Sequence, residues 1–324
     1  MQNQARAFWV TAPGHGEIRS EALGTPGGGQ VLVRALYSGI SRGTESLVFN
    51  GRVPVTERER MRAPFQTGDF PGPVKYGYCS VGRVEQGPAN LQGRDVFVLY
   101  PHQTHFIVPT EAVHTLPDDV PSARAVLAAN VETAVNGLWD ARPHVGDRIA
   151  VVGAGTVGCL VAWLATRIAG TRVELIDINP ERASIAKALG ARFATPSTAA
   201  RDADVVIHAS GTADGLALAL ELAGQETRIV EMSWFGDQMV SLPLGGPFHA
   251  RRLAIVSSQV GTIAPSQRPR WDHRRRMALA LSLLADPVLD HLITGETPFE
   301  RLPDVMTSLS SGSSHTLCHR IVYD

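Results

Sequence analysis

Six consecutive residues carry the clearest chemical pattern in the sequence. Residues 153–158 read Gly-Ala-Gly-Thr-Val-Gly, a G-x-G-x-x-G pattern that follows one apolar stretch and opens another. Between a strand and a helix, the first glycine permits a tight turn, the second lets the backbone approach a pyrophosphate, and the third lets helix and strand pack closely. The N–H groups at the helix start would face that diphosphate. The pattern predicts a dinucleotide site formed by Gly153, Ala154, Gly155, Thr156, Val157 and Gly158.

An acidic residue ends the next apolar stretch, residues 172–177. A carboxylate at Asp177 would accept hydrogen bonds from the adenosine ribose and repel a 2′-phosphate, so we expect NAD(H) rather than NADP(H). We place Ile178 and Arg182 in the same site, although Arg182 would also suit a 2′-phosphate. The alternative is a glycine turn without a ligand, with Asp177 capping the helix that starts near Pro180.

The elements that must position these residues alternate between strands and helices. The predicted strands cover residues 148–152, 172–177, 204–209, 228–232 and 253–257. The predicted helices cover residues 122–129, 157–169, 180–189 and 274–284. Such alternation predicts an α/β fold with a parallel, doubly wound sheet.

The first third of the chain is rich in glycine and proline and contains short strand-like segments. These segments are residues 7–10, 30–37, 82–85, 95–100 and 104–109. Short strands separated by turn signals suggest a compact β-barrel or sandwich-like unit. A last strand-like segment, residues 318–323, would return to this unit. We therefore expect one domain from residues 1–121 and 291–324, and a cofactor domain from residues 122–290.

Composition excludes several classes of protein. The chain has 324 residues, is 44% hydrophobic and 19% charged, and carries a net charge of −1. That balance argues against binding nucleic acid through bulk charge, and the lack of a long apolar run argues against a membrane span. Residues 1–6 lack a secretory pattern, and three cysteines are too few for a disulfide framework. We expect a cytoplasmic protein.

Three longer segments resemble a known family. Residues 146–158 read Gly-Asp-Arg-Ile-Ala-Val-Val-Gly-Ala-Gly-Thr-Val-Gly, residues 177–182 read Asp-Ile-Asn-Pro-Glu-Arg, and residues 186–191 read Ala-Lys-Ala-Leu-Gly-Ala. They resemble the cofactor domain of the medium-chain dehydrogenase/reductase superfamily, the relatives of zinc alcohol dehydrogenase. The resemblance covers nearly the whole chain. It implies a GroES-like β-barrel catalytic domain built from both chain ends, with a Rossmann domain between them.

The chain departs from that family at its metal ligands. Typical zinc members carry Gly-x-Cys-x-Thr-Asp, Gly-His-Glu and a third ligand before the Rossmann domain. Here the three positions hold Ser41, Tyr78 and either Ala129 or Asn130. Catalytic zinc needs three protein donors, usually cysteine, histidine or carboxylate, and these residues are not such a set. Residues 96–108 also lack the cysteines of the family's structural zinc site. We expect no metal.

One branch of the superfamily matches best around the first of these positions. Residues 37–45 read Tyr-Ser-Gly-Ile-Ser-Arg-Gly-Thr-Glu and resemble the bacteriochlorophyllide dehydrogenase branch, although Cys79 departs from its Gly-Tyr-Glu. Those enzymes use NAD to convert a ring-attached 1-hydroxyethyl group to acetyl. We carry over the reaction type, and a ring-containing metabolite in general, without the tetrapyrrole itself.

Without zinc, side chains must supply a proton to the oxyanion that hydride transfer creates. The family match makes Thr44 a relay hydroxyl and places Tyr78 where a zinc-ligating histidine would point into the cleft. Tyr78 is the expected acid, with Lys75 as the cation that would lower its pKa. The remaining candidates are Ser41 to orient the substrate oxygen, Glu45 to support the loop, and Glu132 to replace part of the lost electrostatics. The alternative is that Tyr78 fills space and that Ser41 and Thr44 are turn residues.

The resemblance assigns further positions to the cofactor. Val157 would press the nicotinamide ring towards the substrate, and Thr133 would touch the ring or its ribose. The others follow the carboxyl ends of predicted strands, where ligands of parallel sheets bind. They are Ser210, Gly211, Ser233, Trp234 and Ser258.

Three weaker patterns remain. His102 and His105 would lie on opposite faces of a strand, so we expect surface or cleft histidines rather than metal ligands. The basic residues between 268 and 276 suggest a solvated loop and helix start, or else a guanidinium for the diphosphate or an acidic substrate. Residues 52–69 could form a helix or a lid that sets substrate choice.

These observations lead to one functional expectation and two alternatives. We expect a zinc-independent, NAD(H)-dependent oxidoreductase that interconverts a small-molecule secondary alcohol and a ketone, and by resemblance a homodimer. The first alternative is an NAD(P)H-dependent enone or quinone reductase, which needs no metal to polarise a carbonyl. The second is a non-catalytic dinucleotide-binding sensor.

Overall fold

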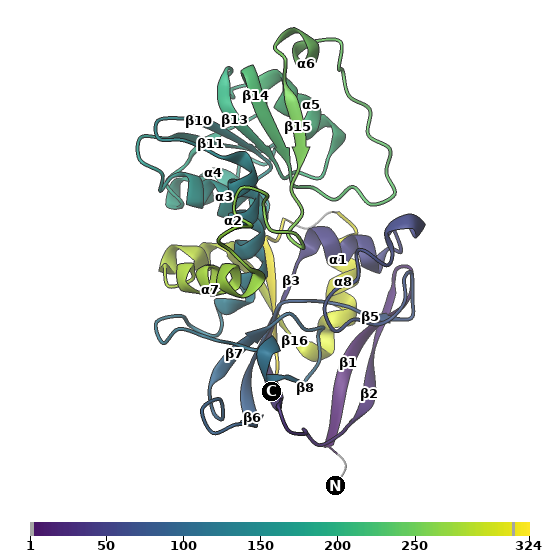
Figure 1. Cartoon of the computed structure of the whole chain (residues 1–324). Coiled ribbons are helices and arrows are strands. Elements are labelled where there is room, and N and C mark those ends of the chain that lie inside the picture. Colours follow the sequence, from purple (N-terminus) through teal and green to yellow (C-terminus); the bar gives the residue numbers. More distant parts are fainter. Residues whose placement is uncertain (1–2, 313–314) are drawn as a thin grey trace. The chain divides into compact units, whose positions relative to one another are not determined.

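The computed structural model describes residues 3–312 and 315–324 (Figure 1). The chain divides into two compact units: unit 1 is Met1–Ala129 with Leu281–Asp324, and unit 2 is Asn130–Ala280. Both boundaries lie further inside the chain than the positions that we proposed from the sequence. For the first boundary the reason is close packing of Val126 against Gly39 in unit 1. A Cβ on Gly39 would lie 2.8 Å from the Val126 carbonyl oxygen. This contact ties residues before Ala129 to unit 1.

Unit 1 is built from two mainly antiparallel sheets. One has the strand order β2-β1-β5-β4, and the other has the order β16-β17-β3-β6-β7-β9, with β8 paired to β3. The strands of the first sheet are β1 (Asn3–Ala12), β2 (His15–Leu23), β4 (Thr67–Gly68) and β5 (Val74–Lys75). Those of the second are β3 (Gln30–Ile40), β6 (Ser80–Gln86), β7 (Asp95–Val98), β8 (His105–Pro109), β9 (His114–Thr115), β16 (Ile293–Pro298) and β17 (Cys318–Val322).

The last strand of the chain completes the larger sheet of unit 1. β17 pairs antiparallel with β3 and parallel with β16, so the expected return of the C-terminal segment is present. Val33, Val81 and Phe97 of this sheet are fully buried. The α-helices of unit 1 are α1 (Arg42–Phe49) and α8 (Leu302–Ser310). Its 3-10 helices are η1 (Val55–Glu57), η2 (Thr110–Ala112), η3 (Ala125–Leu127), η4 (Pro287–Leu292) and η5 (Phe299–Arg301).

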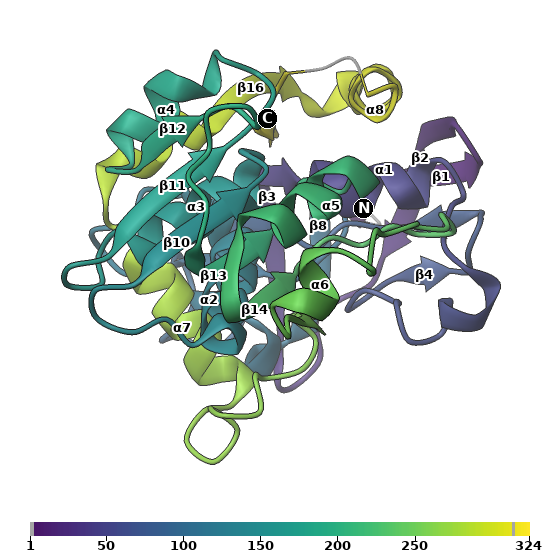
Figure 2. The same cartoon turned by 90° about the horizontal axis from the view of Figure 1, so that it is seen from above.

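Unit 2 contains a six-stranded, fully parallel sheet in the order β12-β11-β10-β13-β14-β15. The strands are β10 (Arg148–Val152), β11 (Arg172–Ile176), β12 (Arg192–Ala194), β13 (Ala203–His208), β14 (Ala223–Glu231) and β15 (Ala254–Ser257). The strand order reverses between β10 and β13, and ligands of such sheets bind at the carboxyl edge at that point. Figure 2 shows this sheet with its helices.

Helices cover the sheet of unit 2 because its strands are apolar on both faces. They are α2 (Ala128–Ala141), α3 (Thr156–Ala165), α4 (Arg182–Ala188), α5 (Ala213–Leu222), α6 (Pro247–Ala250) and α7 (His273–Leu283). α3 packs on β10 and β11, and α5 packs on β10, β13 and β14. α3 connects β10 to β11, and α5 connects β13 to β14, so the two connections run in opposite directions along the sheet. Because both crossovers are right-handed, the two helices lie on opposite faces of the sheet.

Several predicted elements were wrong in part. Residues 122–129 are mostly turn and 3-10 helix, since Pro121 supplies the carbonyl for that turn and α2 begins only at Ala128. Residues 52–69 hold the short η1, turns and the two-residue strand β4 instead of a helix. α5 was missed, and its start is fixed by Thr212, whose hydroxyl accepts a hydrogen bond from the Gly215 N–H.

Two further properties concern the whole described chain. Within residues 3–312 and 315–324, no helix is both long and apolar enough to cross a membrane. The three cysteines are buried and carry free thiols: Cys79, Cys159 and Cys318.

Candidate functional site

The glycine-rich loop of unit 2 joins β10 to α3, as the sequence predicts. Gly153 has a φ of +104°, and a Cβ there would lie 2.6 Å from the Ser210 backbone nitrogen. A Cβ on Gly158 would lie 1.9 Å from the Gly153 carbonyl oxygen. A Cβ on Gly155, in contrast, would meet no protein atom within 4 Å. The fold therefore requires the first and third glycines, while the second leaves open space above the loop.

That open space lies at the start of α3. Gly155 is the N-cap residue and provides no side-chain cap, and Thr156 and Val157 follow as partly exposed residues. The first N–H groups of a helix have no partner within the helix, and they carry its positive dipole end. The loop is thus chemically suited to a diphosphate.

The acidic residue after β11 contacts the same loop. Asp177 accepts a hydrogen bond from the Ala154 N–H at 2.6 Å and another from the Asn179 N–H at 2.8 Å. It therefore holds the turn after β11 and does not cap α4, whose N-cap residue is Glu181, and it remains only partly buried. Ile178 beside it is 85% exposed, whereas Arg182 is 8% exposed. Arg182 acts on a buried neighbour instead: burial raises the pKa of the Cys159 thiol to about 12, and the charge of Arg182 opposes that rise.

A polar network that the sequence analysis missed lies at the ends of β13 and β14. We name it the Glu231 network, and its members are His208, Ser210, Thr212, Glu231 and Ser233. His208 is fully buried, with Nδ1 2.6 Å from a Glu231 carboxylate oxygen and Nε2 2.6 Å from the Ser210 hydroxyl. The other Glu231 oxygen accepts from the Ser233 N–H at 2.6 Å, and the Ser233 hydroxyl accepts from the Gly211 N–H at 3.0 Å.

The structure brings together three predicted cofactor residues in this network, Ser210, Gly211 and Ser233. Trp234 follows Ser233, partly buried, and Ser258 follows β15 and binds Glu231 through its backbone N–H. Thr133 lies on α2. A signal for the missed pair was present, since His208 and Glu231 are polar residues at the ends of two apolar strands and are partners in the β13–β14 register.

Glu132 occupies a buried ion pair in unit 2. Its carboxylate lies 3.0 Å from the Arg276 guanidinium, which also donates to the Asn136 amide oxygen at 2.6 Å. Burial raises the pKa of Glu132, and Arg276 opposes the rise. Arg276 is 1% exposed, so this member of the basic run does not belong to a solvated helix start. The ion pair gives Glu132 a structural role within unit 2.

In unit 1 the predicted residues around α1 belong to a second buried network. We name it the Glu45 network, and its members are Ser38, Ser41, Glu45, His102 and Tyr323. One Glu45 oxygen accepts from the Ser41 N–H at 2.7 Å, in the manner of a capping box, which holds the start of α1. The other lies 2.9 Å from His102 Nε2. His102 Nδ1 contacts the Ser38 hydroxyl at 2.6 Å, and that hydroxyl contacts the Tyr323 hydroxyl at 2.8 Å.

The expectation of a surface or cleft histidine is wrong for His102. The side chain is 1% exposed and paired with the Glu45 carboxylate. His102 lies in the bend before β8, which begins only at His105, so the strand alternation that we assumed does not apply to the pair. Burial lowers the pKa of His105, which remains partly exposed.

Tyr78 lies beside the Glu45 network and is partly exposed. Its phenol makes side-chain hydrogen bonds with Ser41 and Thr44, so the three predicted hydroxyls are together. Burial raises the pKa of Tyr78, with Cys79 and Glu45 adding to the rise, while the two hydrogen bonds oppose it. The expected cation is absent from these interactions. Lys75 is instead 5% exposed at its side chain and bonded to Glu21 at 2.7 Å and to Gln103 at 2.8 Å.

The donors around Tyr78 do not fit a zinc ion. The matched ligand positions hold the hydroxyls of Ser41 and Tyr78 and either Ala129 or Asn130, and burial raises the pKa of the Cys79 thiol well above its usual value. The best donors nearby, Glu45 and His102, are bonded to each other. Across residues 3–312 and 315–324, no group of three His, Cys, Asp or Glu side chains is arranged to hold a metal.

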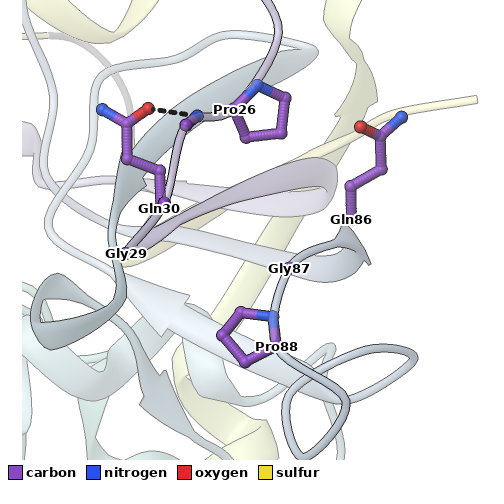
Figure 3. A pocket seen from close by; sticks show the side chains of 8 residues that line it. Pro26, Gly29, Gln30, Gln86, Gly87 and Pro88 are labelled. Atoms are coloured by element: carbon purple, nitrogen blue, oxygen red, sulfur yellow. Dashed lines mark hydrogen bonds between the residues drawn. The ribbon is translucent and has the colours of Figure 1, made fainter.

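Open hollows in the two units lie away from these networks. One hollow of about 340 Å³ in unit 1 is lined by the loops at Pro26–Gln30 and Gln86–Pro88 (Figure 3). Its Gln30 side chain accepts from the Gly27 N–H at 2.9 Å, so it serves its own turn. Another of the same volume in unit 2 is lined by residues such as Trp139 and His144. Neither contains a predicted site residue.

Comparison with known proteins agrees with this geometry. D-guloside 3-dehydrogenase of Escherichia coli (strain K12) is 24% identical over 306 residues, 85% of this chain and 87% of that protein. The structure of L-idonate 5-dehydrogenase from Escherichia coli K-12 has a TM-score of 0.80 at 16% identity, over 99% of both chains. A short chain alcohol dehydrogenase from Escherichia coli CFT073, complexed with NADH, has a TM-score of 0.76 at 18% identity, also over 99% of both chains. No family model matches the chain.

The fold and the glycine-rich loop define a two-domain dehydrogenase architecture, with a GroES-like domain in unit 1 and a Rossmann domain in unit 2. The same architecture extends over nearly the whole of both solved neighbours. The fold is that of the medium-chain dehydrogenase/reductase superfamily, whose cofactor domain the sequence segments resemble.

Proposed function

We propose that this protein is an NAD(H)-dependent oxidoreductase that interconverts a secondary alcohol and a ketone without a catalytic zinc. The observation that carries the proposal is the exchange of metal ligands for hydroxyls: Tyr78 and Ser41 occupy positions where zinc members carry donors, and Tyr78 bonds to Ser41 and to the relay hydroxyl of Thr44. A superfamily member that keeps the dinucleotide loop but has this donor set needs a proton donor of its own.

The relatives support the class of substrate. The names D-guloside 3-dehydrogenase and L-idonate 5-dehydrogenase both place the reacting carbon inside a carbon chain or ring. An alcohol at such a carbon is secondary, and its oxidation product is a ketone. A ring-containing metabolite remains our proposal from the segment at residues 37–45.

Unit 2 has the residues to hold NAD(H). The loop at Gly155 would receive the diphosphate, the partly exposed Asp177 carboxylate would accept from the adenosine ribose, and Ile178 offers an apolar face beside it. The burial of Arg182 supports NAD(H) over NADP(H), because a buried guanidinium is poorly placed for a 2′-phosphate. When bound, the nicotinamide supplies or accepts the hydride.

Unit 1 would handle the proton. During ketone reduction, Tyr78 donates its phenolic proton to the substrate oxygen, and Thr44 or Ser41 passes a replacement proton to the phenolate. Although burial raises the pKa of Tyr78, an alkoxide is still the stronger base, so the transfer runs towards the substrate. In the oxidation direction the phenol must first lose its proton. We therefore propose that ketone reduction is favoured at neutral pH.

Deuterium transfer tests the reaction type. NADH carrying deuterium at C4, on each face in turn, is incubated with aryl ketones, diketones and enones, and the products are analysed by mass spectrometry. We expect deuterium on a carbinol carbon. Deuterium on an alkene carbon would make the protein an enone reductase, and NADH binding without any transfer would favour a sensor. Stoichiometric zinc in the purified protein would contradict the metal-free proposal.

A further inference from the structure

The Glu231 network has a fixed direction of hydrogen bonding. An ionised carboxylate only accepts, so His208 carries a proton on Nδ1, and in the neutral ring its Nε2 then accepts from the Ser210 hydroxyl. The Ser210 oxygen in turn accepts from the Thr212 hydroxyl at 2.9 Å and from the Thr212 N–H at 3.3 Å. The Thr212 oxygen accepts from the Gly215 N–H at 3.1 Å, which caps α5. One carboxylate thus orders every hydroxyl along this path.

The same carboxylate links two separate turns. Through His208 it holds Ser210 in the turn after β13, and through its second oxygen it holds the Ser233 N–H in the turn after β14. The Gly211 N–H donates to the Ser233 hydroxyl and joins the two turns directly. Loss of His208 would remove the link from Glu231 to the Ser210 turn, and loss of Glu231 would remove its links to both turns.

The position of these turns identifies the half of a dinucleotide that they face. Asp177, the proposed adenosine partner, lies on the β11 side of β10, whereas Ser210 and Ser233 lie on the β13 and β14 side. Ser210 also abuts the glycine-rich loop, since a Cβ on Gly153 would lie 2.6 Å from its backbone nitrogen. A dinucleotide whose diphosphate lies on that loop must extend its other half over the Ser210 and Ser233 turns.

We propose that His208 and Glu231 are positioning residues for the nicotinamide-ribose half of the cofactor. They set the two turns, and Ser210, Gly211 and Ser233 then contact the ligand. The inference rests on the proposed function, because it takes NAD(H) as the ligand.

Binding of two ligands to His208→Phe separates positioning from stability. Isothermal titration calorimetry compares NADH with ADP, which lacks the nicotinamide riboside. We expect the dissociation constant for NADH to rise about 10-fold or more, because two buried hydrogen bonds are lost, and that for ADP to stay within about 2-fold. Ser210→Ala removes the hydrogen bonds of the Ser210 hydroxyl, including the one to His208 Nε2, but keeps the pair of His208 and Glu231, and it should raise the dissociation constant for NADH by about 3-fold. This variant replaces His208→Phe in the test if His208→Phe does not fold.

One control and one further substitution complete the comparison. Thr227→Val removes a buried hydrogen bond to the Ala203 carbonyl, 2.8 Å long, between the same strands but near the start of β13, and should alter neither ligand. Glu231→Gln leaves one acceptor oxygen for two N–H donors, His208 Nδ1 and Ser233 N, so it should weaken NADH binding more than ADP binding. If His208→Phe and Ser210→Ala weaken NADH and ADP by equal factors, or neither ligand, the network serves stability alone. If the wild-type protein binds neither ligand, the proposed function itself fails.

Discussion

The glycine-rich loop of unit 2 and the Glu45 network of unit 1 present their polar groups in opposite ways. In unit 2 the N-terminus of α3 opens on a space that no protein atom would fill at Gly155. In unit 1 the buried side chains of Glu45, His102, Ser38 and Tyr323 bond to one another. The N–H groups that would bind the proposed ligand face open space. The polar side chains with a structural role form hydrogen bonds with one another. Tyr78, the proton donor of our proposal, is partly exposed beside this network.

The largest expected effect is a loss of activity on substitution of Tyr78, the proposed proton donor in unit 1. Tyr78→Phe removes the proposed acid and should lower kcat about 1000-fold, while the dissociation constant of NADH is unchanged. Steady-state kinetics and a binding titration measure the two quantities. Tyr76→Phe is the matched control, because Tyr76 is a buried neighbour in T-shaped contact with Tyr78. Equal losses in both variants would show that Tyr78 only fills space.

Breaking the closed network should affect stability. His102→Phe leaves the buried Glu45 carboxylate without its partner and should lower the free energy of unfolding by about 3–4 kcal/mol. Denaturant unfolding measures the change. His105→Phe, three residues further along and partly exposed, should cost less than about 1 kcal/mol. A small loss at His102 would mean that the Glu45 network is not closed in the way described.

Two substitutions in the glycine-rich loop should affect protein stability and NADH binding separately. Gly158→Ala places a methyl against the Gly153 carbonyl and should cost about 2–3 kcal/mol of stability. Gly155→Ala meets no protein atom, so stability should hold, but NADH binding should weaken about 10-fold because the methyl occupies the proposed diphosphate space. Thermal unfolding and calorimetric titration distinguish the two. Unaltered NADH binding in Gly155→Ala would argue against a ligand at this loop.

The smallest expected effect is a loss of stability at acid pH caused by one histidine of unit 1. Burial lowers the pKa of His319, with Glu296 opposing, and the ring lies 3.0 Å from the Thr297 hydroxyl. In the unfolded chain this histidine takes up its proton near pH 6.5, while the folded chain does so only at lower pH. Stability should therefore fall as pH drops through that interval. His319→Gln should flatten the dependence in thermal unfolding between pH 7 and 5, and an unchanged slope would contradict this role.

Features formed by neighbouring residues could be predicted from the sequence, whereas pairs from distant segments could not. The cofactor loop could be predicted because strand, turn and helix follow one another within residues 148–165, and each glycine has a local reason. The pair of His208 and Glu231 could not, because it depends on the register between two parallel strands. His102 was misplaced because it lies before β8 rather than on it, and Lys75 because nearness in sequence to Tyr78 does not make contact. Long-range pairs need the fold.

The three buried cysteines give each unit its own unfolding reporter. Burial raises the pKa of Cys318 and of Cys159 to about 12 and that of Cys79 well above its usual value, so these thiols resist alkylation in the native protein. A thiol reagent added during slow denaturation would modify each one only when its surroundings open. Modification of Cys159 would then time the opening of unit 2, and modification of Cys79 and Cys318 that of unit 1, without any introduced label.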